Sequence, residues 1–157
     1  MTLALQYKDS KVAGRLAPAL AAEGCDVAPH YGSNATKAEA IAVDLRAQYP
    51  TQTFRTFAAD LSDRATARAL VASVLADPSF AGKPVSILVA NAGLGRRIRD
   101  VAAISEDDWD EMMEVNERSQ FVVTKAALAG MRAQGWGSIA AGIPSRSCTE
   151  SFVQVYP

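Results

Sequence analysis

Histidine, cysteine and long hydrophobic runs are scarce in this sequence. Its 157 residues include one histidine, His30, and two cysteines, Cys25 and Cys148. These three side chains cannot supply the paired ligands of a zinc site or a framework of disulfides. No apolar run reaches the roughly 18 residues of a membrane helix, and Gln6 already interrupts the first apolar stretch. We therefore expect no metal centre, no membrane partner and a reducing, cytoplasmic setting.

Net charge is also nearly absent. The chain contains sixteen Lys and Arg residues and seventeen Asp and Glu residues, which gives a formal net charge of -1. Such a balance offers no electrostatic footprint for nucleic acid or for an anionic membrane. Hydrophobic side chains make up 49% of the residues and charged ones 21%, which is typical of one globular domain. The sequence predicts a single unit over residues 1–157.

Short apolar segments alternate with longer helical ones along the chain. This alternation is typical of parallel βαβ units with helices on both faces of a sheet. The last segment, residues 138–157, is expected to be an irregular tail with at most one more strand. The expected strands are 3–5, 26–31, 53–58 and 85–90, and the expected helices are 12–23, 36–48, one capped by Ser62, and 105–134.

Several residues mark where these elements begin, end or break. Gly24 and Gly135 each follow a helical segment, as helix-ending glycines do. Ser105 and Asp108 have the spacing of a capping box at the start of the longest helix. Two prolines conflict with the pattern, because proline lacks a backbone N–H. We expect a late start of the first helix because of Pro18, and a bulge at Pro29.

Five segments occur in an order that points to a known family. Asn91-Ala-Gly93 directly follows the most continuous apolar strand, and Val115-Asn116 lies in the middle of the longest helix. With these landmarks the sequence resembles the short-chain dehydrogenase/reductase family over about residues 2–137. The resemblance implies a Rossmann-like, three-layer α/β/α fold with a mostly parallel sheet, incomplete after about the fifth strand. The other three segments are 59–63, 121–127 and 131–135.

The glycine fingerprint of this family is degenerate in this chain. The family pattern Thr-Gly-x-x-x-Gly-x-Gly falls on residues 7–14, where only Gly14 is retained. Lys8 and Val12 place a Cβ where the backbone of the family approaches the pyrophosphate. We therefore expect weak cofactor binding. The resemblance implies cofactor contacts from residues of four segments: Ser10, Lys11 and Gly14; Ser33 and Asn34; Asp60 and Leu61; Asn91, Ala92 and Gly93.

The expected cofactor is NADP(H) rather than NAD(H). Sites specific for NAD place an acid at the end of the second strand to bind the ribose hydroxyls, and residues 30–34 contain none. Ser33 and Asn34 could receive a 2′-phosphate there, with Lys11 at a position that is basic in NADP-preferring relatives. A solvated turn is the alternative for these three residues. We expect no chemical role for His30.

The resemblance also implies hydride transfer between nicotinamide and a carbonyl or alcohol, with Asn116, a serine and a tyrosine as catalytic residues. Tyr156 is the tyrosine in the right region, but Pro157 follows it and the lysine of the Tyr-x-x-x-Lys motif has no position. Without that cation little of the tyrosine ionises, so we expect feeble catalysis at most. The serine is Ser145 or, alternatively, Ser138.

Three interpretations follow. The chain is an oxidoreductase resembling carbonyl or 3-oxoacyl reductases; a catalytically inactive, NADP-binding or oligomerising fragment; or a truncated or misspliced product. The expected partners are a small-molecule carbonyl or alcohol and a second copy bound through the helix at 106–134, where Trp109, Met113 and Phe121 could pack. An exposed edge at the fifth strand would also favour association.

Overall fold

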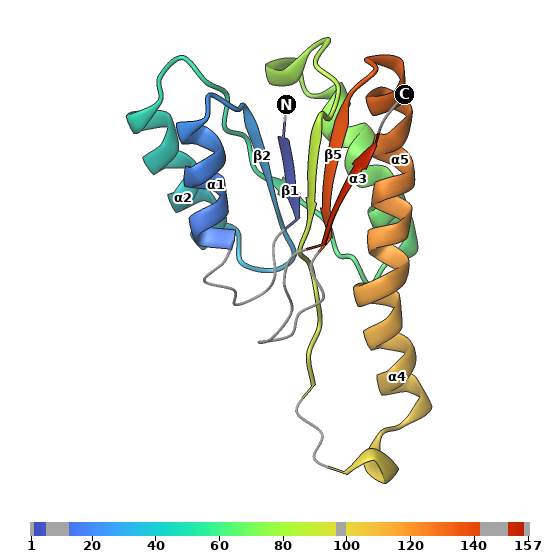
Figure 1. Cartoon of the computed structure of the whole chain (residues 1–157). Helices are drawn as coiled ribbons and strands as arrows, with labels where there is room; N and C mark the ends of the chain where they lie inside the picture. Colours follow the sequence, from blue (N-terminus) through green and yellow to red (C-terminus); the bar gives the residue numbers. More distant parts are fainter. Residues whose placement is uncertain (1, 6–12, 97–99, 142–150, 156–157) are drawn as a thin grey trace.

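A six-stranded sheet carries helices on both of its faces, in a computed structural model that describes residues 2–5, 13–96, 100–141 and 151–155 (Figure 1). The strands are β1 (Thr2–Leu5), β2 (Val27–Tyr31), β3 (Phe57–Ala58), β4 (Ile87–Ala90), β5 (Gly137–Ala141) and β6 (Ser151–Val155). The helices are α1 (Ala13–Ala22), α2 (Ala35–Gln48), α3 (Arg64–Ala76), α4 (Glu106–Met113) and α5 (Ser119–Ala133). A π-helical turn, Glu114–Arg118, joins α4 to α5, and 3₁₀ turns occupy Pro78–Phe80 and Val101–Ala103.

The strand order β3-β2-β1-β4-β5-β6 confirms the expected α/β fold class. The first five strands in the sequence pair in parallel, and β6 pairs antiparallel with β5. Two expectations are therefore wrong. The segment 138–157 contributes to two strands rather than one at most, and β5 has β6 along the edge that was expected to be exposed. The sequence between these two strands is short, polar and contains a proline, so the alternation of apolar and polar residues did not reveal β6.

Each face of the sheet has its own hydrophobic core. On one face α1 and α2 cover the sheet, and on the other α3 and α5 do (Figure 1). Val27 and Ala28, neighbours on β2, lie in different cores because successive strand residues point to opposite faces. Leu88 on the central strand β4 is fully buried, as expected for a parallel strand covered on both sides. Within the described ranges no helix is long and apolar enough to cross a bilayer.

Neither proline disturbs its element as expected. Helix α1 begins at Ala13 and contains Pro18, so the late start is wrong. Proline there removes the hydrogen bond toward the carbonyl four residues earlier and crowds that carbonyl, yet α1 continues to Ala22. The bulge at Pro29 is also wrong, because β2 keeps one register with β1 through Pro29. The missing N–H of Pro29 faces β3, where pairing lapses between the Val27–Phe54 bridge and the His30–Phe57 pair.

Helix ends follow the sequence signals with one exception. Gly24 and Gly135 adopt positive φ values of 82° and 69° after α1 and α5. The Ser105 side chain accepts a hydrogen bond from the Asp108 N–H, which confirms the predicted N-terminus of the long helix. The N-cap of α3 is Asp63, not the predicted Ser62, and its side chain accepts from the Thr66 N–H. Ser62 instead binds the side chain of Asp60.

Candidate functional site

A cavity of about 320 Å³ lies at the carboxyl ends of the parallel strands. Strand β1 has β2 on one side and β4 on the other, so the strand order reverses there, and open α/β sheets bind ligands at such a switch point. Three loops and two helical segments form the walls of the cavity. They contribute residues 30–34 with Lys37, residues 59–62, residues 92–94, and Glu111 with Val115.

Most of the predicted cofactor residues meet in this cavity. Six of them line it: Ser33, Asn34, Asp60, Leu61, Ala92 and Gly93. Asn91 is half-buried directly after β4, and Gly14 is the second residue of α1. Ser10, Lys11, Ser145 and Tyr156 lie outside the described residues, so their roles stay predictions. The alternative serine, Ser138, lies opposite Ile87 at the amino end of β5, far from the edge that forms the cavity.

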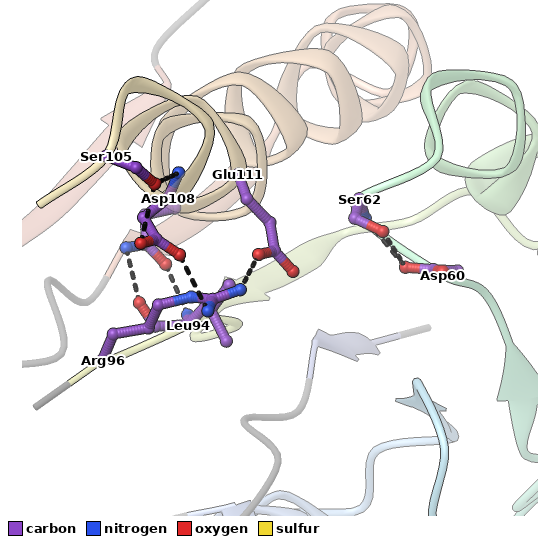
Figure 2. A network of polar contacts seen from close by, with 8 residues as sticks. Asp60, Ser62, Leu94, Arg96, Ser105, Asp108 and Glu111 are labelled. Atoms are coloured by element: carbon purple, nitrogen blue, oxygen red, sulfur yellow. Dashed lines mark hydrogen bonds and ion pairs between the residues drawn. The ribbon is translucent and has the colours of Figure 1, made fainter.

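The loop after β4 is fastened to the long helix by side-chain hydrogen bonds. Asn116 accepts from the Leu94 N–H at 2.5 Å and donates to the Leu94 carbonyl at 3.0 Å. Farther along the helix, Gln120 donates to the Ala92 carbonyl at 2.8 Å. Arg96 forms ion pairs with Asp108, at 2.9 Å, and with Glu111 (Figure 2). The loop is therefore held in one conformation at the rim of the cavity.

The π-helical turn brings these helix residues onto one side. In an α-helix, residues four apart share a face, so Glu111 would be followed by Val115. A π turn inserts one extra residue, and such turns are frequent at functional sites. Glu111, Asn116 and Gln120 consequently all reach the same loop. Both polar groups of the Asn116 side chain contact Leu94, so this residue positions the loop, and its predicted catalytic role stays a prediction.

The turn after β3 presents a carboxylate to the cavity. Asp60 accepts hydrogen bonds from the N–H of Ser62 at 2.9 Å and from its hydroxyl at 2.7 Å (Figure 2). Leu61 beside it is buried and supplies apolar surface. The turn thus offers an oriented hydrogen-bond acceptor next to an apolar wall.

His30 ties the end of β2 to that turn. Its side chain is 1% exposed, and Nε2 donates to the Ala59 carbonyl at 2.8 Å. Nδ1 has no hydrogen-bond partner among the described residues. Burial lowers the pKa of His30, and the hydrogen bond to Ala59 opposes this shift only in part. His30 is therefore a neutral structural link between two walls of the cavity.

The segment after β2 contains no acid. Asn34 caps α2, its Oδ1 accepting from the Lys37 N–H at 3.0 Å, and the first turn of α2 has no acidic residue. Lys37 lines the cavity, although it was not among the predicted cofactor residues. Its position three residues after a helix-capping asparagine is the signal that could have found it. Tyr31, Glu111 and Val115 also line the cavity and were not among the predicted cofactor residues.

A family model described as short chain dehydrogenase matches residues 12–155, nearly the whole chain. The chain belongs to the short-chain dehydrogenase family. It is 35% identical to nodulation protein G of Azospirillum brasilense over 123 residues, 77% of this chain and 46% of that protein. It is 31% identical to a 2-dehydro-3-deoxy-D-gluconate 5-dehydrogenase of Dickeya dadantii strain 3937 over 147 residues, 94% of this chain and 54% of that protein.

Solved structures share the fold. A 3-oxoacyl (acyl-carrier-protein) reductase of Agrobacterium tumefaciens C58, with NADP bound, superposes with a TM-score of 0.73 at 27% identity. The match covers 88% of this chain and 50% of the reductase. The chain spans about half the length of the curated relatives named above. In the described part of the chain, no group of three or more His, Cys, Asp or Glu side chains could hold a metal ion.

Proposed function

We propose that the protein is an oxidoreductase that binds NADP(H) and reduces or oxidises a small carbonyl or alcohol compound. The observation that carries the proposal is the cavity at the switch point of the sheet, lined by the loops that follow β2, β3 and β4. A bound nicotinamide cofactor would supply the hydride for the reduction or accept it in the oxidation. The described residues hold the other end of the cofactor, its adenosine half.

The walls of the cavity suit adenosine. Leu61, Ala92 and Val115 offer apolar surface to the purine ring, and Asp60 offers a carboxylate acceptor to its amino group. The Asp60 carboxylate is already oriented by Ser62. Apolar walls with a few placed polar groups are typical of cofactor sites. The cavity volume of about 320 Å³ is at the lower end of ligand pockets, which fits part of a dinucleotide rather than all of it.

The preference for NADP(H) rests on the missing acid after β2. A carboxylate there would bind the ribose hydroxyls of NAD and repel the 2′-phosphate of NADP. Residues 30–34 offer instead the Ser33 hydroxyl and the Asn34 amide. Lys11, in the predicted fingerprint loop, would add a positive charge. The NADP bound to the Agrobacterium reductase is consistent with this choice.

For the chemistry we propose Asn116, Ser145 and Tyr156 as catalytic residues. Tyr156 would deliver the proton, Ser145 would hold the carbonyl oxygen, and Asn116 would complete the proton path. The substrate class we propose includes 3-oxoacyl compounds, in line with the name of the Agrobacterium reductase. Replacing Tyr156 by Phe should abolish any NADPH-dependent ketone reduction that a protein containing this chain performs.

Exposed apolar side chains on the long helix favour a homo-oligomer. Trp109 is 55% exposed and Phe121 64% exposed, and Met113 lies on the same helix. Exposed large apolar side chains on one element favour association. A second candidate function, an oligomerising partner without activity of its own, depends on the same residues. Light scattering should give at least a dimer for the unchanged chain and a smaller species for Trp109→Ser with Phe121→Ser.

Calorimetric titration with NADPH and NADH tests the proposed function. We expect saturable binding of NADPH and weaker binding of NADH. Tighter binding of NADH would overturn the assignment of Ser33 and Asn34. A chain that is folded by circular dichroism and binds neither dinucleotide would overturn the proposal as a whole.

A further inference from the structure

The imidazole ring of His30 is buried in the wall of the cavity with one of its two nitrogens unpaired. The Ala59 carbonyl oxygen can only accept a hydrogen bond, so Nε2, 2.8 Å away, carries the proton of the neutral ring. Nδ1 is then an acceptor, and it has no hydrogen-bond partner among the described residues. The ring therefore has a bonded position for one proton and none for a second.

The hydrogen bond from His30 holds the turn after β3 against the end of β2. Ala59 is the first residue after β3, and its N–H donates to the Tyr31 carbonyl at 3.1 Å. Because His30 binds the carbonyl of the same residue, both backbone groups of Ala59 are tied to β2. Asp60 and Leu61, which line the cavity, follow directly in the sequence. The position of this wall therefore depends on the His30 ring.

A second proton would disturb this arrangement. An imidazolium ring has two N–H donors, and the one at Nδ1 would be buried without an acceptor in the described part of the chain. A buried charge is strongly unfavourable unless it is paired and hydrogen-bonded. Water is available on the side of the cavity, which His30 lines, but the ring gains hydration there only by leaving the Ala59 carbonyl. Protonation of His30 therefore releases the turn after β3.

The other charged groups of the cavity do not compensate such a proton. Lys37 repels a second cation. The two carboxylates already bind other described side chains, those of Ser62 and Arg96. Apart from His30, the titratable side chains that line the cavity are Tyr31, Lys37, Asp60 and Glu111.

The helices over this face of the sheet add no free acid. His30 points to the same face as Ala28, two residues earlier on β2, and α3 and α5 cover that face (Figure 1). Neither helix contains an Asp or Glu, so their charged side chains are all cations. Glu114, in the turn that leads into α5, pairs with Arg64 and Arg118. The described surroundings of His30 thus favour its neutral form.

We propose that His30 is a positioning residue of the cavity, and that a dinucleotide binds tightly only while the ring is neutral. This inference rests on the proposed function, in which the turn after β3 contacts the adenosine half of the cofactor. The neutral ring holds Ala59, and Asp60 then lies where the purine amino group can reach it. Protonation releases the turn and weakens binding. By linkage, ligand binding drives off a proton wherever the free protein carries one on His30.

The direction of the pH dependence follows from this linkage. Burial holds the pKa of His30 in the free, folded protein below the ordinary 6.5, and a ligand that prefers the neutral ring lowers this pKa further. Above about pH 6.5 the ring is neutral with or without ligand, so the affinity does not depend on it. As the pH falls through the pKa of the free protein, the affinity falls by at most about tenfold per pH unit.

Calorimetric titration with NADP⁺ from about pH 8 to about pH 5.5 tests the proposal on the unchanged chain and on His30→Gln. The glutamine amide still donates to Ala59 but cannot take a second proton. The 2′-phosphate of NADP⁺ itself titrates near pH 6, in both proteins alike, so the difference between them isolates the ring. The affinity of the unchanged chain should fall more steeply than that of His30→Gln. Measurements in two buffers of different ionisation enthalpy should show more protons released by the unchanged chain.

His30→Leu separates the hydrogen bond from the titration. It can neither bind the Ala59 carbonyl nor take up a proton, so at pH 8 it should bind NADP⁺ about fivefold more weakly than His30→Gln, the scale of one hydrogen bond. Its affinity should fall with pH no more steeply than that of His30→Gln. Circular dichroism at each pH confirms that the proteins compared are folded.

A measurement on the unchanged chain alone serves if a variant fails to fold. The ring resonances of His30, the one histidine of the chain, should titrate at a lower pH with saturating NADP⁺ than without it. If NADP⁺ leaves the ring pKa unchanged or raises it, or if His30→Gln keeps the full pH dependence of the affinity, the role of His30 is wrong while the proposed function stands. If the unchanged, folded chain binds no dinucleotide at any pH, the proposed function and this inference are both wrong.

Discussion

Two loops line the same cavity and are held in different ways. The loop after β4, residues 92–96, is fixed by Asn116, by Gln120 and by the two acids that pair with Arg96. The segment after β2, residues 31–34, is held at its ends, by the His30 link to Ala59 and by the Asn34 cap of α2. The loop after β4 has three hydrogen bonds and two ion pairs to side chains of the long helix, whereas Lys37 next to the other segment has no ion pair in the described part of the chain.

The difference separates two tasks within one site. A loop whose hydrogen bonds are already made is preorganised and gains little from a ligand. A segment with an open space at Gly32 and an uncompensated charge gains most when an anion arrives. We therefore propose that the β4 side gives the cavity its shape and that the β2 side sets the cofactor preference. Variants of the first loop should change stability, and variants of the second should change affinity.

The largest effect on stability is expected for Asn116→Leu. The variant leaves the N–H and carbonyl of Leu94 without their partners, and two lost hydrogen bonds of partly buried groups should lower the free energy of unfolding by about 2–3 kcal/mol. Urea denaturation measures the change. The control is Glu117→Gln, an exposed neighbour in the same π turn, which should stay within about 0.5 kcal/mol of the unchanged protein. Equal stability of both variants would mean that Asn116 does not hold the loop.

The Asn34 cap gives a smaller effect and separates stability from affinity. Asn34→Ala removes the acceptor for the Lys37 N–H and should lower the free energy of unfolding by about 1 kcal/mol. Asn34→Asp keeps a capping oxygen, so its stability should match that of the unchanged protein. The added negative charge should nevertheless weaken NADP⁺ binding while NAD⁺ binding changes little. Loss of stability in Asn34→Asp, or unchanged NADP⁺ binding, would contradict this separation.

The ion pairs of Arg96 should contribute less, because their side chains are 28–44% exposed. Arg96→Met should lower the free energy of unfolding by about 0.5–1 kcal/mol, and less in high salt. The stability of Arg96→Lys should lie between that of Arg96→Met and that of the unchanged protein, because a lysine ammonium cannot bind two acids at once in the planar geometry of a guanidinium. Denaturation at low and high ionic strength checks both points. A loss that is independent of salt would indicate packing rather than charge.

Near neutral pH the smallest effect should come from the titration of His30. Its pKa in the folded protein lies below the ordinary value of 6.5 because the ring is buried. Above that ordinary value both the folded and unfolded forms carry a neutral ring, and below it the unfolded chain binds the proton first. Stability should therefore fall as the pH drops below about 6.5 and level off once the folded form is protonated.

His30 is the only histidine, so its ring resonances report this titration without overlap. In His30→Gln, whose amide can still donate to Ala59, the part of the pH dependence that starts near 6.5 should vanish. A His30 ring that titrates at or above 6.5 in the folded protein would show that Nδ1 has found a partner.

The sequence predicted the order of the elements and much of the cavity. Asn91-Ala-Gly93 and Asp60 could be placed because a loop directly after a buried parallel strand lies at a known edge of the sheet. Glu111 could not, because its contribution depends on how far a turn of α4 stands from a loop of another βαβ unit. The π turn at Asn116 and the β6 pairing also escaped, since neither leaves a periodic pattern of apolar residues.

The effect of Pro29 was misjudged for a related reason. Proline rules give the local loss of a hydrogen bond, but which neighbour would have received that bond depends on the sheet. Pro29 is accommodated because its missing donor faces β3, which is only two residues long. The tertiary arrangement, rather than the strand itself, decides whether such a residue causes a bulge.

The most direct test of the account maps NADP⁺ on the chain by backbone amide shifts in a ¹⁵N-labelled sample. The account predicts saturable shifts concentrated in residues 31–37, 59–62 and 92–94, with the largest response near Lys37 and Gly32. NAD⁺ should move residues 59–62 and 92–94 but move residues 31–37 less. Saturable shifts confined to the exposed residues Trp109, Met113 and Phe121, or no saturable shifts at all, would contradict the assignment of this cavity to a dinucleotide.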